Sequence, residues 1–200
     1  MSQHAALQRS KAELIERARL RNRTRKAAMV TEAKQEWRPE SVLLVGAGQG
    51  WTPLDIVVEV AATEGVPRVV ATDLHRISNV PWPYVVSDAL ALPFPDKSFD
   101  LVLSNAVIEH VGGVEEQRRF LAEHLRVAHH FILTTPNRWF FMETHTKALL
   151  RHWSPTWRAA QGHEFSRLLS KGELAELLPG GAKVLGSRLG STFTAYGDCA

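Results

Sequence analysis

The chain has 200 residues, of which 44% are hydrophobic, and this length fits one domain with a substantial core. No apolar run is long enough to span a bilayer, the polar N-terminus lacks the apolar core of a secretion signal, and the single cysteine, Cys199, excludes an internal disulfide, so we expect a cytoplasmic protein. The net charge of +3 is uneven, because residues 1–38 carry ten Lys/Arg against four Asp/Glu while the rest is slightly acidic, which argues against a nucleic-acid-binding face on the domain.

The first predicted element is a helix over residues 4–36, a stretch without glycine or proline. One face of this helix carries four apolar residues that would pack on the domain: Leu7, Leu14, Ile15 and Ala18. Five basic residues lie between Arg19 and Lys26, either as a solvated face or as an attraction for anionic lipid or an acidic substrate. We therefore expect a basic N-terminal helical extension, residues 1–38, with peripheral membrane contact as one open role, and a single domain over residues 39–200.

Residues 42–50 run from four apolar residues directly into a turn with the pattern G-x-G-x-G, whose glycines are Gly46, Gly48 and Gly50. The apolar run does not alternate with polar residues, which is typical of a strand buried on both faces in a parallel sheet. The glycines let the backbone turn sharply and approach a ligand closely. Thr52 and Pro53 then begin a helix predicted to include residues 54–62. Ligands of open α/β sheets bind at such junctions.

Strands and helices alternate along the following residues, with strands predicted at 68–73, 84–88, 99–104 and 130–135 and a helix at 114–127. This alternation indicates a parallel sheet with right-handed crossovers. A capping box at Ser170 begins a short helix that ends near Leu178. Two further strands, residues 183–189 and 192–196, are too close in sequence to be parallel, so we expect an antiparallel hairpin at the sheet edge.

Residues 137–165 are dense in aromatic residues and histidines and follow the fifth strand directly. Such a segment either belongs to the core or forms an aromatic, lid-like insertion over a ligand pocket. Four residues here are of metal-ligand type: Glu143, His145, His152 and His163. Their spacing matches no tight metal-binding pattern, so no metal is assigned.

An acidic residue, Asp73, ends the strand that follows the glycine turn, 23 residues beyond Gly50. A carboxylate at this place can accept hydrogen bonds from both ribose hydroxyls of a nucleotide. In a dinucleotide fingerprint beginning at Gly46, the third glycine would fall at Trp51, which would crowd the helix against the strand. No Lys-Ser/Thr pair follows, which excludes a nucleoside-triphosphate loop. A nucleoside ligand without a pyrophosphate is favoured.

Residues 88–102, D-A-L-A-L-P-F-P-D-K-S-F-D-L-V, resemble the core signature of class I methyltransferases that use S-adenosylmethionine, specifically the methyltransferase type 11 group. Residues 104–111 continue the resemblance, which covers about residues 40–136. The resemblance implies a Rossmann-like, doubly wound α/β fold with a seven-stranded sheet, mostly parallel, that ends in an antiparallel hairpin. It also implies transfer of the methyl group by direct displacement, for which the protein mainly supplies alignment and exclusion of water.

The resemblance implies a cofactor site for S-adenosylmethionine built from the glycine turn and from the residues after the second, third and fourth strands: Gly46, Ala47, Gly48, Gly50, Asp73, Leu74, Asp88, Ala89 and Asn105. In this site Asp73 would hold the ribose hydroxyls and Asp88 would accept from the adenine amino group. Asn105 would border the sulfonium and the acceptor.

The acceptor implied by the resemblance is a small molecule or a glycan- or lipid-linked compound, methylated on oxygen or nitrogen. A hydroxyl acceptor needs a general base, for which His110, His145 and His163 are candidates. The family usually has an acidic residue two positions before the first glycine, where this chain has Leu44, so a non-catalytic S-adenosylmethionine-binding relative stays open. An NAD-dependent oxidoreductase is the third alternative, disfavoured by Trp51. The sequence does not fix the oligomeric state.

Overall fold

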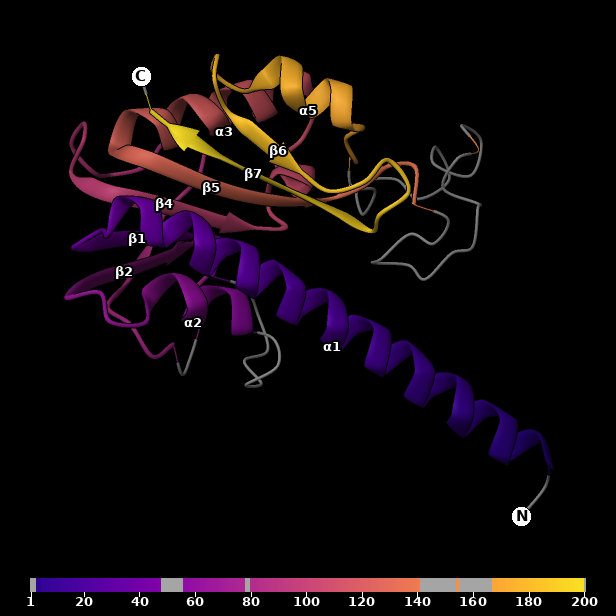
Figure 1. The fold of residues 1–200 in the computed structure, drawn as a ribbon. Coiled ribbons are helices and arrows are strands. Elements are labelled where there is room, and N and C mark those ends of the chain that lie inside the picture. The colour runs from indigo at the N-terminus through magenta and orange to yellow at the C-terminus, as the bar shows by residue number, and fades with distance from the viewer. Residues whose placement is uncertain (1–2, 48–55, 78–79, 141–153, 155–166, 200) are drawn as a thin grey trace.

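The protein is built around one mixed sheet, and the computed structural model describes residues 3–47, 56–77, 80–140, 154 and 167–199 (Figure 1). The strands are β1 (Ser41–Val45), β2 (Arg68–Asp73), β3 (Tyr84–Val86), β4 (Phe99–Asn105), β5 (Ala128–Pro136), β6 (Lys183–Leu185) and β7 (Thr192–Asp198). They form a seven-stranded sheet in the order β3-β2-β1-β4-β5-β7-β6. The first five strands are parallel, and β7 is antiparallel to both β5 and β6. This topology confirms the predicted Rossmann-like fold with its C-terminal hairpin.

Helices cover both faces of the sheet (Figure 1). They are α1 (Gln3–Trp37), α2 (Val57–Thr63), the 3-10 helix η1 (Ile108–His110), α3 (Val114–Val127) and α5 (Lys171–Leu177). Helices α1 and α2 lie on one face, and α3 and α5 lie on the other. The predicted capping box is present at the start of α5, where the Ser170 side chain accepts from the backbone N–H of Glu173 at 3.3 Å.

The strand β1 shows why its sequence has no polar alternation. Leu43 and Val45 pack in the apolar cluster that contains Phe120 of α3, on one face of the sheet. Val42 and Leu44 pack in the second cluster, which contains Val30 of α1 and Val58 of α2. Both faces of β1 are therefore buried, as the continuous apolar run predicted.

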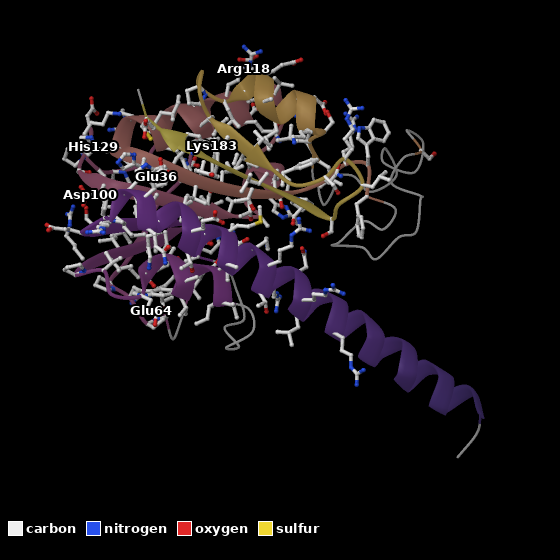
Figure 2. The ribbon with its side chains drawn as sticks, in the orientation of Figure 1. Glu36, Glu64, Asp100, Arg118, His129 and Lys183 are labelled. Carbon is white, nitrogen blue, oxygen red and sulfur yellow. The ribbon has the colours of Figure 1, made fainter. Side chains whose placement is uncertain are left out.

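The helix α1 has two parts. Its C-terminal part packs on the sheet beside α2 and contributes Val30 and Ala33 to the core, and Glu36 lies 3.6 Å from the ammonium of Lys183 on β6 (Figure 2). Its N-terminal part runs beyond the sheet (Figure 1). The side chains of Leu7, Leu14, Ile15 and Ala18 lie outside the described residues, so their predicted packing stays a prediction, as does the boundary at residue 38. Among the described residues no helix is both long and apolar enough to cross a membrane.

Two predicted strands are shorter than expected. The strand predicted at 183–189 ends at Leu185, because Gly186 takes a positive φ of 116°, which is not a strand conformation. The strand predicted at 84–88 ends at Val86, so Asp88 lies in the loop beyond the sheet edge. The polar side chain of Asp88 is thereby free of the strand and available to a pocket at that edge.

Candidate functional site

A cavity of about 520 Å³ opens at the carboxyl ends of β1, β2, β3 and β4. This volume is in the range of small-molecule and cofactor sites. The cavity is lined by residues that follow these four strands and by η1: Val45, Gly46, Thr72, Asp73, Leu74, His75, Ser87, Asp88, Ala89, Leu90, Asn105, Ala106, Val107, His110 and Val111. Six predicted cofactor residues therefore share one cavity: Gly46, Asp73, Leu74, Asp88, Ala89 and Asn105.

Gly46 forms the floor of the cavity at the end of β1. Its φ is +70°, and a Cβ built on it would lie 2.4 Å from Cγ2 of Val107, a contact that real Cβ atoms do not make. The backbone N–H of Gly46 donates to the carbonyl oxygen of Thr72 at 2.8 Å, which fixes the turn against β2. A glycine is therefore required here both for the backbone conformation and for the close approach of the two loops.

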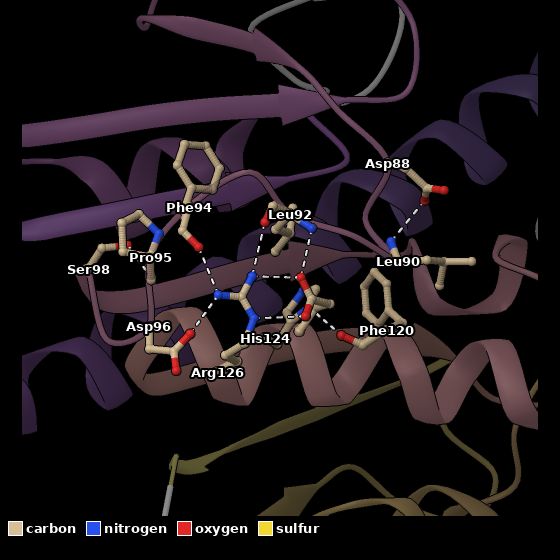
Figure 3. Close-up of polar contacts among 11 residues, drawn as sticks. Asp88, Leu90, Leu92, Phe94, Pro95, Asp96, Ser98, Phe120, His124 and Arg126 are labelled. Atoms are coloured by element: carbon tan, nitrogen blue, oxygen red, sulfur yellow. Dashed lines mark hydrogen bonds and ion pairs between the residues drawn. The ribbon is translucent and has the colours of Figure 1, made fainter.

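Asp73 and Asp88 place two carboxylates at the ends of neighbouring strands. Oδ1 of Asp73 accepts the backbone N–H of His75 at 3.2 Å. Oδ1 of Asp88 accepts the backbone N–H of Leu90 at 2.8 Å (Figure 3). These turn contacts use one oxygen of each carboxylate and fix its direction, and a carboxylate oxygen carries several lone pairs. Each acid therefore both caps its turn and keeps capacity to accept hydrogen bonds from a ligand.

An apolar surface and a histidine complete the cavity wall. Leu74 is 59% exposed, an unusual exposure for a leucine, and it lines the cavity beside Asp73. An exposed apolar side chain next to hydrogen-bond acceptors suits the flat face of a base or ring. His110, on η1, lines the same cavity, whereas His145 lies outside the described residues. His110 is the one predicted base candidate within the described residues, and it lines the cavity.

The loop after β3 is held by two side chains from α3, Arg126 and Glu123 (Figure 3). The guanidinium of Arg126 donates to the carbonyl oxygens of Leu92 and Phe94, at 2.9 and 2.8 Å, and to the carboxylate of Asp96 at 2.8 Å. It also pairs with Glu123 of its own helix, whose carboxylate accepts the backbone N–H of Leu92. The hydrogen bonds from Arg126 lower the pKa of Glu123, so the carboxylate stays ionised and the pairing persists.

A buried polar cluster lies beside Asn105, at the end of β4. The side-chain oxygen Oδ1 of Asn105 accepts from Nζ of Lys26 on α1, at 2.8 Å, and from Oγ1 of Thr134, at 2.6 Å. The side-chain nitrogen Nδ2 donates to Oε1 of Glu59 on α2, at 2.9 Å. Lys26, Glu59 and Thr134 are all buried. Three elements and two opposite charges therefore meet at one amide that lines the cavity.

The two charged groups of this cluster, Lys26 and Glu59, are shielded from water. Burial lowers the pKa of Lys26, and the carboxylates of Glu59 and Glu109 work against that shift. Burial also raises the pKa of Glu59, against the hydrogen bond from Asn105 and the nearby charge of Lys26. The second carboxylate oxygen of Glu59, Oε2, is buried without a hydrogen-bond partner among the described residues. Each charge therefore depends on the other for its stability.

Three of the predicted cofactor residues are not among those that line the cavity. Two of them, Gly48 and Gly50, are outside the described residues, as is Trp51. Ala47 is buried in the core cluster of α1 and α2 and is not among the cavity-lining residues, so its predicted role is not supported by its position. Leu44, the departure from the family pattern, is 1% exposed and packs in the same cluster.

Some cavity residues and their supports were missed by sequence reasoning. His75 lines the cavity two residues after Asp73, a position that the rule for strand ends could have identified. Lys26 was predicted only as one of five basic residues, either solvated or attracted to anionic lipid or an acidic substrate, and Glu59 lies in the predicted helix 54–62 without a predicted role. Neither residue has a local sequence signal, because their meeting point at Asn105 is set by the packing of α1 and α2.

The predicted metal candidates, Glu143, His145, His152 and His163, lie outside the described residues. Within the described part of the chain, no group of three or more His, Cys, Asp or Glu side chains is arranged to hold a metal ion.

A second cavity, of about 380 Å³, lies at the same edge of the sheet, where β5 ends and β7 begins. It is lined by Trp139, Ser170, Lys171, Gly172, Arg188, Leu189 and Phe193. Trp139 is 52% exposed, and the guanidinium of Arg138 lies 5.7 Å from its ring centroid. Of the predicted aromatic segment 137–165, only residues 137–140 and 154 are described, so this cavity shows where the segment begins.

The sequence of this chain is similar to those of known methyltransferases. Residues 43–130 match a family model described as a methyltransferase domain. Over 113 residues the chain is 31% identical to ajmaline N-methyltransferase of Rauvolfia serpentina, a match that covers 46% of this chain and 34% of that protein. The chain therefore spans about a third of the length of this relative.

Solved structures agree in fold. A structure described as an S-adenosylmethionine-dependent methyltransferase, possible histamine N-methyltransferase, from Thermotoga maritima superposes with a TM-score of 0.57 at 17% identity, over 94% of this chain and 96% of that one. A putative O-methyltransferase from Nostoc punctiforme superposes with a TM-score of 0.55 at 14% identity, over 86% and 55% of the two chains. At these identities the likeness describes the fold alone.

Proposed function

Since residues 43–130 form a methyltransferase domain of the class I, type 11 group, which uses S-adenosylmethionine, we propose that this chain transfers a methyl group to a nitrogen or oxygen atom of a small-molecule acceptor. The observation that carries the proposal is the single cavity that gathers Gly46, Asp73 and Asp88 at the carboxyl edge of the sheet. The relative at 31% identity is an N-methyltransferase, which favours nitrogen as the acceptor atom.

The residues of the cavity fit this cofactor. Asp73 and Asp88 offer carboxylate oxygens at neighbouring strand ends, which suits the ribose hydroxyls and the amino group of adenine. Leu74 offers an exposed apolar surface for the base. Gly46 lets the loop that carries Val107 pack directly against the end of β1, which shapes this wall of the cavity.

When bound, S-adenosylmethionine supplies a methyl group that is already activated by its positive sulfur. The protein then needs mainly to align the acceptor and to exclude water. Asn105 lies at the end of the cavity away from Asp73 and Asp88, because β4 is on the opposite side of β1 from β2 and β3. An amine acceptor needs only to arrive unprotonated. For a hydroxyl acceptor we assign His110 as the base that takes the proton, since it lines the same cavity.

Calorimetry tests the cofactor assignment. We expect S-adenosylmethionine and S-adenosylhomocysteine to bind and NAD not to bind. Binding of NAD alone would instead support a dinucleotide oxidoreductase and would overturn the proposal.

Turnover on an acceptor panel tests the activity itself. The panel should contain amines, phenols, sugar hydroxyls and a lipid-linked sugar, with methyl transfer followed by mass spectrometry. Transfer to an amine or hydroxyl supports the proposal. Binding of the cofactor without transfer to any member would support a non-catalytic relative, the alternative that Leu44 leaves open.

The basic part of α1 supports a further element of the proposal, contact with an anionic lipid surface. Arg17, Arg21 and Arg25 are exposed on this helix. Clustered basic side chains on a helix are attracted to anionic lipid. Sedimentation with vesicles that do or do not contain an anionic lipid tests this element, and equal sedimentation with both would contradict it.

A further inference from the structure

We propose that Lys26 and Glu59 are positioning residues of the cofactor cavity, which fix the side chain of Asn105 and make the N-terminal helix part of the site. The inference rests on the proposed function, because the cavity of Asn105 is the one assigned to S-adenosylmethionine. Neither residue lines the cavity itself, so both act through Asn105.

The partners of Asn105 determine how its amide is oriented. Lys26 offers an ammonium, which only donates hydrogen bonds, and it lies 2.8 Å from Oδ1. Glu59 offers a carboxylate, which only accepts when ionised, and it lies 2.9 Å from Nδ2. A flipped amide would direct its N–H groups at the ammonium and its oxygen at the carboxylate. The charge pair therefore permits one orientation only.

This orientation limits what Asn105 offers to a ligand. Lys26 and Thr134 occupy both lone pairs of Oδ1, and Glu59 occupies one of the two N–H groups of Nδ2. The hydrogen-bonding capacity that these contacts leave is one N–H. Asn105 is thus a fixed donor at the end of the cavity away from Asp73 and Asp88. A fixed donor suits an oxygen or nitrogen lone pair, such as the carboxylate of the cofactor's amino-acid part.

A contact elsewhere between the same two helices serves as a matched control. Nζ of Lys34 on α1 donates to the backbone carbonyl oxygen of Glu64, just beyond α2, at 2.8 Å (Figure 2 labels Glu64). Lys34 and Glu64 are not cavity-lining residues. Loss of this contact loosens the packing of α1 on α2 without altering Asn105.

The test compares S-adenosylhomocysteine affinity and melting temperature in Lys26→Met, Glu59→Gln and Lys34→Met. We expect Lys26→Met to weaken the affinity about tenfold, the factor for a lost hydrogen bond to a charged group. Glu59→Gln, whose amide oxygen can still accept from Nδ2 of Asn105, should weaken it by a smaller factor. We expect Lys34→Met to keep the affinity within about twofold, whatever its melting temperature. Thr134→Val, which removes one donor to Oδ1 and no charge, should weaken the affinity less than Lys26→Met.

Removing one member of a buried charge pair can unfold a protein, and a double variant covers that case. Lys26→Met/Glu59→Gln leaves no unpaired charge, so we expect it to fold and still to bind S-adenosylhomocysteine about tenfold more weakly. Wild-type affinity in this folded double variant would overturn the inference, as would an affinity loss that Lys34→Met reproduces at the same melting temperature. A wild-type protein that binds no S-adenosylhomocysteine would instead overturn the proposed function.

Discussion

The guanidinium of Arg126, in the last turn of α3, donates to the carboxylate of Asp96 across the loop that follows β3, at 2.8 Å. The same guanidinium donates to the carbonyl oxygens of Leu92 and Phe94 and pairs with Glu123 (Figure 3). Asp88, which lines the cofactor cavity, begins this loop. Residues 88–96 therefore form a loop with the carboxylate of the proposed cofactor cavity at one end and the anchor to α3 at the other.

We predict that Arg126→Met lowers the free energy of unfolding by about 2–3 kcal/mol, since it leaves the carboxylate of Glu123 and two carbonyl oxygens without their donor. Because the loop carries Asp88, S-adenosylhomocysteine affinity should also fall. Arg118→Met is the control on the same helix, since its pair with Glu115 is long, 3.9 Å, and exposed (Figure 2 labels Arg118). It should change stability by no more than about 0.5 kcal/mol. Denaturant unfolding measures the stability of both variants, and calorimetry measures their affinity. Equal free energies of unfolding for Arg126→Met and Arg118→Met would contradict the anchoring role of Arg126.

Local patterns predicted most of the fold because they are written in consecutive residues. The apolar run at residues 42–45 and the capping box at Ser170 each specify one element through short-range physics, and the structure confirms both elements. Asp73 was predicted from its place at the end of a strand and Asp88 from the family resemblance, and both residues line the cavity.

Contacts across the chain could not be predicted in this way. Lys26 and Asn105 are 79 positions apart in the sequence and are joined by a hydrogen bond. Arg126 and Asp96 are joined in the same way and are 30 positions apart. No pattern near Lys26 separates it from its basic neighbours, because its burial follows from how α1 lies on the sheet. The predicted end of the strand at residue 189 failed for a related reason, since the positive φ of Gly186 is a property of the folded turn.

Asp73 should contribute to cofactor affinity and little to folding. We predict that Asp73→Ala weakens S-adenosylhomocysteine binding by about 1.5–3 kcal/mol, the range for hydrogen bonds to a charged group. Wild-type affinity in a variant with a normal circular dichroism spectrum would refute the ribose assignment.

Asp100, near the start of β4, should instead contribute to folding and little to cofactor affinity (Figure 2). Its carboxylate accepts from the hydroxyl of Ser41 and from the backbone N–H groups of Glu40 and Ser41. Burial opposes its ionisation, but these hydrogen bonds outweigh burial and lower its pKa. We expect Asp100→Asn to reduce the free energy of unfolding and to leave cofactor affinity unchanged. A loss of affinity equal to that of Asp73→Ala would show that affinity follows stability.

His124 makes stability depend on pH. Burial lowers its pKa from 6.5 to about 4, against the hydrogen bond from the ring to the carbonyl oxygen of Phe120. Between pH 6.5 and pH 4, His124 is therefore protonated in the unfolded chain but stays neutral in the folded chain. This contribution to stability is complete above pH 6.5, and acidification to pH 4 removes about 3 kcal/mol. In His124→Phe, which keeps an aromatic ring beside Phe120, that part of the pH dependence should vanish. Urea unfolding at several pH values measures the free energy of unfolding of both proteins. The same dependence on pH in both proteins would contradict the prediction.

Cys199 should report unfolding by its chemistry. Its side chain is buried, 7% exposed, and burial raises the pKa of the thiol to about 12, despite the nearby charge of Lys97. Because only the thiolate is nucleophilic, iodoacetamide at pH 8 should label the folded protein slowly and the urea-unfolded protein rapidly. Mass spectrometry follows the labelling. Equal rates in the two states would show that the C-terminal end of β7 opens readily.

The last prediction concerns Trp139 and the choice of acceptor. The cofactor cavity is lined by residues after β1 to β4 and by η1, whereas Trp139 follows β5 and lines the second cavity, with Lys171 and Arg188. An exposed indole offers a flat apolar face to a ring or sugar, at the edge of the sheet where we propose that the methyl group is transferred. Trp139→Ala should therefore reduce methyl transfer and leave S-adenosylhomocysteine affinity within about 0.5 kcal/mol, the level of an uninvolved site.

The competing explanation is that Trp139 only packs against its neighbours, among them Arg138. In that case the melting temperature and the cofactor affinity of Trp139→Ala would fall together, and transfer would fall in proportion. Trp139→Phe separates the two explanations further, since it keeps a flat apolar ring and should retain most of the transfer. Transfer, affinity and melting temperature must be measured on the same preparations, because only their ratio distinguishes an acceptor contact from a packing contact. Loss of transfer at constant affinity and constant melting temperature assigns Trp139 to the acceptor.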